Sequence, residues 1–97
     1  MNLSGFTASL DKTQPPKGLD LPLQALWWDA KGDWNRAHEC AQQVEDISPG
    51  QWVHAYLHRK EGDQSNASYW YKRCGRKPSK DTLEAEWRSI AEALLTS

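Results

Sequence analysis

Cysteine, phenylalanine and methionine are scarce in this 97-residue chain, which contains two, one and one of them. The two thiols, Cys40 and Cys74, stand alone rather than in a C-x-x-C pair, and no signal-peptide pattern precedes them. We therefore expect a reduced, cytoplasmic compartment. Their spacing does not decide whether they pair with each other.

Long apolar runs and an excess charge of either sign are also missing. No stretch approaches the ~20 apolar residues that would span a bilayer. The chain has 12 basic and 13 acidic residues. Without a global field, neither a membrane nor a nucleic acid is the expected partner.

Tryptophan, in contrast, is abundant, with six residues in a chain of this length. Buried indoles can compensate for the small number of Ile, Val and Phe side chains. We expect most of the six in the core, and one or two left in a groove would mark a binding surface.

A dipeptide, Gly-Asp, occurs twice, at Gly32-Asp33 and Gly62-Asp63, 30 residues apart. An Ala stands seven residues before each Gly and another stands five residues after it. A fixed period in this range is typical of helical repeat arrays. Glycine allows the positive φ that ends one helix, and the following Asp can cap the next.

Helical spacing of apolar residues continues from Asp20 to the C-terminal end, with no strand-like alternation. We predict an all-α protein of five helices, bounded approximately by residues 20–31, 33–46, 48–61, 63–74 and 81–95. Ser48 is expected to cap the third helix, and Asp81 with Glu84 is expected to open the last. Residues 1–19 are predicted to be an extended or partly disordered arm, and residues 20–97 a single helical domain.

Two helix–Gly-Asp–helix units resemble tetratricopeptide repeats over residues 20–95. The matching positions in the first unit are Ala25, Trp28, Gly32-Asp33, Ala37, Ala41, Val44 and Pro49. Those in the second are Ala55, His58, Gly62-Asp63, Ala67, Tyr71, Cys74 and Pro78. The period is 30 rather than the family's usual 34. The resemblance implies two tandem hairpins and a C-terminal capping helix.

The resemblance also implies a binding face, because in such arrays the first helix of each hairpin lines the concave side. Carried onto this chain, the partner-binding candidates are Asp29, Trp52, Tyr56, Arg59 and Lys60. Trp52 and Tyr56 would be apolar anchors, and Arg59 would bind a carboxylate or a carbonyl oxygen. The partner would be a protein or peptide. Since two repeats bury little surface, we also expect homodimers through an exposed Trp face.

The second Gly-Asp turn carries more recognition-type residues than the first, namely His58, Glu61, Asn66 and Tyr69. His54, His58 and Glu61 can share one helix face, and two imidazoles with a carboxylate could bind Zn²⁺ or Fe²⁺. The interpretation that the sequence favours over this metal set is that His58 packs against the turn and is hydrogen-bonded across the hairpin. The stretch from His54 to Tyr71 is also similar to small microbial proteins, which implies a bacterial source but no function.

Catalytic motifs are lacking: there is no G-x-S-x-G, no P-loop and no G-x-G-x-x-G. We therefore expect no enzyme and no cofactor. The sequence predicts a protein-interaction module, with a small metal-binding or catalytic protein built on His54, His58 and Glu61 as the alternative.

Overall fold

The first hairpin is formed by α2 (Leu21–Ala30) and α3 (Trp34–Gln42), in a computed structural model that describes residues 1–96. Asp20 caps α2 by accepting from the Leu23 amide. Gly32 has a φ of 85°, and the Asp33 side chain accepts from the Arg36 amide. One residue thus ends a helix and the next begins another.

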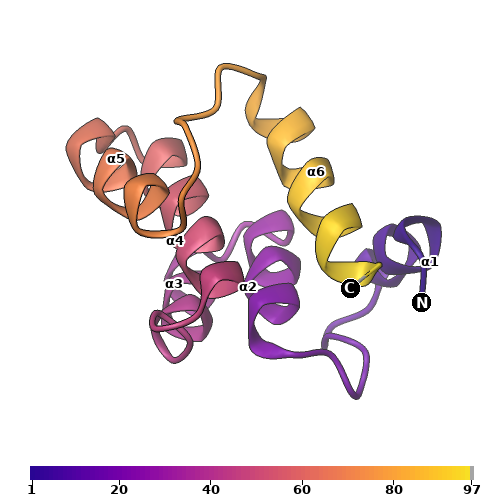
Figure 1. Cartoon of the computed structure of the whole chain (residues 1–97). Coiled ribbons are helices and arrows are strands. Elements are labelled where there is room, and N and C mark those ends of the chain that lie inside the picture. Colours follow the sequence, from indigo (N-terminus) through magenta and orange to yellow (C-terminus); the bar gives the residue numbers. More distant parts are fainter. Residues whose placement is uncertain (97) are drawn as a thin grey trace.

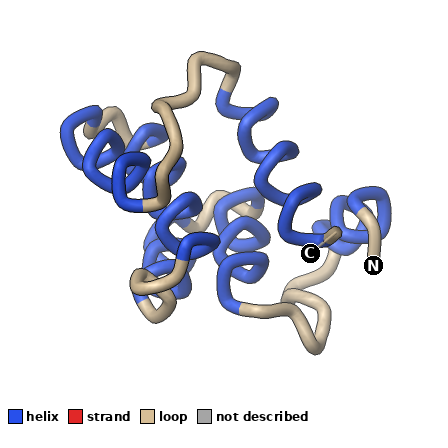
Figure 2. Tube along the Cα trace, in the orientation of Figure 1, coloured by secondary structure: helices blue, strands red, loops and turns tan. Residues whose placement is uncertain are grey.

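The second hairpin, α4 (Ser48–Lys60) with α5 (Gln64–Arg73), repeats this turn. Gly62 has a φ of 89°, and Asp63 accepts from the Asn66 amide. The two hairpins stand in tandem through contacts of α4 with α3 and α2. The predicted all-α fold is confirmed: the described residues form helices joined by loops (Figure 2) and no strand.

Three predicted helix ends are corrected. Helix α3 ends at Gln42 rather than near Asp46. The N-cap of α4 is Ile47, without a side-chain hydrogen bond, so Ser48 is already helical. Helix α6 (Leu83–Leu95) begins after Thr82, whose side chain accepts from the Ala85 amide. A hydroxyl cap takes the place of the expected Asp81–Glu84 pair.

The N-terminal segment is helical where an extended arm was expected. It forms α1 (Leu3–Ala8) and a 3₁₀ turn, η1 (Ser9–Asp11), so the described chain has six α-helices rather than five. Phe6 is fully buried and stacks on Trp87 with ring centroids 5.7 Å apart. The indole N–H of Trp27 donates to Ser9 Oγ at 3.1 Å. The segment therefore belongs to the core.

The closing helix α6 is present, and it packs on α2 and α4, one helix from each hairpin (Figure 1). Its Trp87 is buried and donates from Nε1 to the Leu26 carbonyl oxygen at 3.0 Å. Ile90 and Ala91 are also buried in the main core. The first helices of the two hairpins are therefore covered by the chain's own last helix over part of their length.

Tryptophan contributes to the core as predicted, but it forms no exposed face. Trp27, Trp70 and Trp87 are buried, whereas Trp28, Trp34 and Trp52 are half-buried. The expected exposed Trp surface for self-association is thus not seen. The longest helices described, α4 and α6, have 13 residues each, and no described helix is both long and apolar enough for a membrane span.

Candidate functional site

A buried carboxylate, Asp29, lies where α2 faces α4. Its side chain is almost fully buried and accepts a 3.1 Å hydrogen bond from the Tyr56 hydroxyl. The Lys60 ammonium lies 3.0 Å from the other carboxylate oxygen. Burial, and then the neighbouring Asp29 charge, raises the pKa of Tyr56 well above its ordinary value. The phenol therefore remains a donor, and Asp29 is satisfied on both oxygens.

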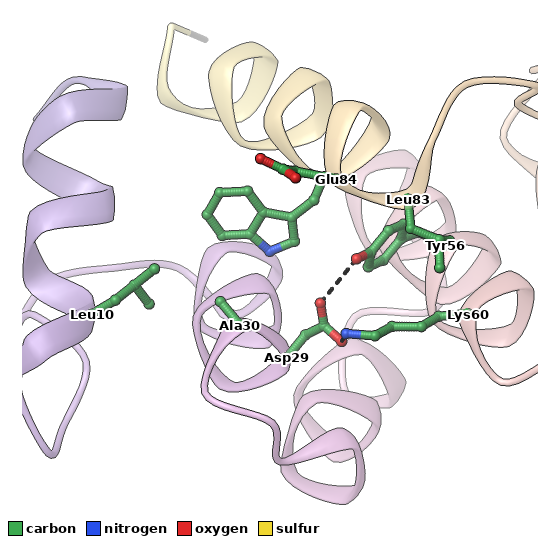
Figure 3. Close-up of a pocket in the computed structure, with 8 residues that line it drawn as sticks. Leu10, Asp29, Ala30, Tyr56, Lys60, Leu83 and Glu84 are labelled. Atoms are coloured by element: carbon green, nitrogen blue, oxygen red, sulfur yellow. Dashed lines mark hydrogen bonds and ion pairs between the residues drawn. The ribbon is translucent and has the colours of Figure 1, made fainter.

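Beside this group lies a cavity of about 280 Å³ between α2, α4, α6 and η1, which we call the α2/α4/α6 cavity. Its apolar lining consists of Leu10, Ala30, Leu83 and Trp87. Its polar edge consists of Asp29, Tyr56, Lys60 and Glu84. In Figure 3, the Asp29–Tyr56 and Asp29–Lys60 contacts stand on one side of the opening and Leu10 on the other.

A second buried carboxylate, Glu86 of α6, joins α6 to the second hairpin. Arg59 Nη1 lies 2.8 Å from Glu86 Oε1, and the Tyr71 hydroxyl donates to Oε2 at 2.5 Å. Trp52 Nε1 also donates to Oε2, at 3.4 Å. Arg59 further donates to the Asp81 carbonyl oxygen. Burial and the hydrogen bond to Glu86 raise the pKa of Tyr71 above its ordinary value.

The five partner-binding candidates fall into two groups, one around the carboxylate of Asp29 and one around that of Glu86. Asp29, Tyr56 and Lys60 border the cavity. Trp52 and Arg59 instead bind Glu86, and the Arg76 guanidinium covers the Trp52 ring at 3.4 Å from its centroid. Of the five, Lys60 has the most accessible charge, with 39 % of its side chain exposed.

All three histidines of the chain meet between α3 and α4. The rings of Trp34, His38 and His54 form a stack with successive centroids 4.9 Å and 4.8 Å apart. His58 meets His38 and His54 edge-on, each at 5.3 Å. We call His38, His54 and His58 the histidine cluster. The sequence interpretation placed Glu61 with His54 and His58, and missed His38 as the third member.

Glu61 instead binds the outer side of His58, with its Oε1 2.5 Å from His58 Nδ1. A carboxylate only accepts, so Nδ1 carries the proton. His58 lies against the turn as the packing alternative expects, but its hydrogen bond goes to Glu61 rather than across the hairpin.

His54 is the buried member of the cluster whose ring nitrogens have no hydrogen-bond partner among the described residues. Its side chain is 3 % exposed. Burial, followed by the nearby His38, His58 and Arg73, lowers the pKa of His54 to about 4. Burial also lowers the pKa of His38. The His54 ring is therefore neutral at pH 7 and keeps a lone pair on one nitrogen.

The remaining second-turn residues do not join the histidine cluster. Tyr69 is 54 % exposed on α5, where the Arg73 guanidinium lies 5.7 Å from its ring centroid. The backbone N–H of Asn66 donates to the carboxylate of Asp63, which caps α5.

The two cysteines, Cys40 and Cys74, are free thiols, and burial raises the pKa of each.

The sequence interpretation missed two residues of these sites, Glu86 and His38, and only Glu86 carries a clear signal. Glu86 lies three residues after Leu83 and four before Ile90, so it stands on the apolar face of a regular helix. A carboxylate there calls for a buried partner. His38 carries a weaker signal, because only the packing of α3 on α4 brings it to the other two histidines.

Together these features define a small all-α protein of two hairpins closed by a sixth helix, with an apolar cavity edged by the Asp29–Lys60 ion pair and a cluster of three histidines. No protein-family model, no curated protein and no solved structure matches the chain.

Proposed function

We propose that this chain is a non-enzymatic protein-interaction module, which binds one apolar side chain of a partner peptide in the α2/α4/α6 cavity. The observation that supports it is the cavity itself, apolar inside and edged by Asp29, Tyr56 and Lys60. These are three of the residues that the resemblance to tetratricopeptide repeats implies for partner binding.

The size of the cavity favours a side chain over a larger ligand. At about 280 Å³ it falls just below the ~300–1,000 Å³ of typical small-molecule sites. A single large apolar side chain, buried in a pocket and surrounded by weaker contacts, is the usual anchor of a protein interface.

Charged groups at the cavity edge can orient the partner backbone. Lys60 uses one of its three N–H donors on Asp29, which leaves others for a carbonyl oxygen of the partner. Glu84 is exposed on the α6 side and can accept a backbone N–H. We therefore propose a short extended segment with one Leu, Phe or Trp anchor as the ligand.

The proposal extends to the compartment. A cytoplasmic location, in a bacterial cell as the similarity to microbial proteins implies, is supported by the two free thiols. The balanced charge supports a protein rather than a nucleic acid as the partner.

Filling the cavity tests the proposal. Peptides selected by display on the wild-type protein should share an apolar anchor. They should bind Ala30→Leu at least about tenfold more weakly, since the added side chain occupies the apolar volume. Ala93→Leu, an equal change at an exposed position of α6, should bind normally. Equal binding by the two variants, or no selected peptide at all, would refute the assignment.

A further inference from the structure

The three imidazoles of the histidine cluster offer nitrogen atoms at close range. One ring nitrogen from each of His38, His54 and His58 lies within 4.8 Å of those of the other two. They come from two hairpins, because His38 is on α3 and the other two are one helical turn apart on α4. Every histidine in the chain is used here.

His54 has unused binding capacity inside this cluster. A neutral imidazole has one donor and one acceptor nitrogen, and both atoms of His54 are buried without a partner. Such groups normally find a hydrogen-bond partner, a water or an ion. The ring stands perpendicular to Trp70 with centroids 4.1 Å apart, which fixes its position without supplying a polar partner for either nitrogen.

His58 is oriented in the manner of a metal ligand. Its Nδ1–H donates to the Glu61 carboxylate, which leaves Nε2 free to act as a ligand. A carboxylate on the outer nitrogen is the usual support of a metal-bound histidine, because it fixes the tautomer and raises the basicity of the ring.

We propose that His38, His54 and His58 bind a single Zn²⁺ ion, with Glu61 as the carboxylate that orients His58. Three imidazoles suit a borderline divalent cation such as Zn²⁺. Zinc–nitrogen bonds of ~2.0–2.1 Å place ligand atoms ~3.4 Å apart in a tetrahedron. The observed separations of up to 4.8 Å must therefore contract. His38 is half-buried and its ring stacks on His54 at an interplanar angle of 15°, so we expect this ring to turn when the ion binds.

The ion would join the two hairpins. Three protein ligands would leave the fourth position of a tetrahedral Zn²⁺ ion to water. Because the ligands lie on α3 and α4, bound Zn²⁺ would stabilise the packing of one hairpin against the other, as a structural metal does in a small domain. The site does not depend on the α2/α4/α6 cavity and is separate from the proposed peptide interaction.

Titration of tag-free protein with ZnCl₂ tests the proposal. We expect one equivalent to bind with a Kd below about 1 μM, accompanied by a rise in Tm. His38→Ala removes a half-buried ligand without opening the core, and it should weaken binding by at least about 100-fold. Asn35→Ala, at an exposed position of the same helix, is the matched control and should bind like wild type.

Two measurements keep the test independent of any loss of folding. Glu61→Gln retains the shape of the side chain, and it should weaken Zn²⁺ binding by ~10–100-fold. In the wild-type protein, side-chain NMR signals of all three histidines should change together and reach completion at one equivalent. If only His38 responds, or if His38→Ala and wild type bind equally, the site is refuted.

Discussion

The hydroxyl of Tyr71 on α5 donates a 2.5 Å hydrogen bond to the buried carboxylate of Glu86 on α6. Arg59 of α4 binds the other oxygen of the same carboxylate. The Glu86 side chain of the last helix thus accepts hydrogen bonds from both helices of the second hairpin. Buried ion pairs of this kind contribute little net stability when complete, but removal of one partner leaves the other charge unpaired.

The replacement Glu86→Ala should lower the free energy of unfolding by about 3–5 kcal/mol. Arg59, with 16 % of its side chain exposed, would lose its carboxylate, and the Tyr71 hydroxyl would lose its acceptor. Urea denaturation measures the change. Glu84→Ala, two residues earlier on the exposed face of α6, should stay within about 0.5 kcal/mol of wild type. Similar losses in both variants would contradict the role of Glu86.

Two glycines should respond differently to substitution by alanine. A Cβ at Gly50 would lie 1.9 Å from the Val44 carbonyl oxygen, which is backbone and cannot move alone. We expect Gly50→Ala to cost about 3 kcal/mol through overpacking. Gly62 has open space around it, so Gly62→Ala should cost only the ~1–2 kcal/mol of a left-handed alanine. Thermal unfolding of both variants gives the order, and the reverse order would contradict the close approach at Gly50.

Phe6→Ala should destabilise the whole domain by about 3–5 kcal/mol, because Phe6 is fully buried against Trp87. Ser4→Ala, an exposed change in the same helix, should have little effect. The measurement is urea denaturation followed by far-UV circular dichroism, which reports all the helices. A cooperative transition unchanged in Phe6→Ala would show that α1 does not support the core.

Stability of the metal-free protein should fall as the pH is lowered from about 6.5 to 4. The pKa of His54 is lowered from 6.5 to about 4 in the folded state, so within this window the unfolded chain binds the extra proton. The part of the free energy of unfolding that depends on neutral His54 is fully present above pH 6.5, and about 3 kcal/mol of it is lost by pH 4. His38, His58 and Arg73 face this ring, and any positive charge on them adds to the cost of protonation.

The measurement is the free energy of unfolding in chelator at several pH values, for wild type and for His54→Gln. Both proteins carry the same carboxylates, so the difference between their profiles isolates His54. Parallel profiles between pH 6.5 and pH 4 would contradict the lowered pKa.

The hairpin turns could be predicted from the sequence because their causes are local. Gly32 and Gly62 supply the backbone conformation, and Asp33 and Asp63 supply the caps. The N-terminal helix could not, because residues 1–19 have little helical periodicity of their own. Its position depends on Phe6 meeting Trp87, 81 positions later in the chain. Tertiary packing of this kind determines many short helices that local propensity leaves open.

The candidate sites also combine residues that local sequence predicts with residues that only tertiary packing brings together. The partner-binding candidates were chosen by repeat position, which predicts the helix but does not reveal what packs on it. Arg59 and Trp52 therefore turned out to bind Glu86 of α6. His54 and His58 were recognisable from their spacing of four residues. His38 was not, since it reaches them across the interface between α3 and α4.

Because α6 packs across α2 and α4, it would compete with any peptide that bound the same face of these two helices. A short loop, residues 74–82, connects it to α5. A segment held by a short flexible linker has an effective concentration in the millimolar range. An outside peptide that needed the whole face would have to outcompete α6 at that concentration. A partner that needs only the α2/α4/α6 cavity, as proposed above, would avoid this competition, so the last helix would favour ligands that contact a small area.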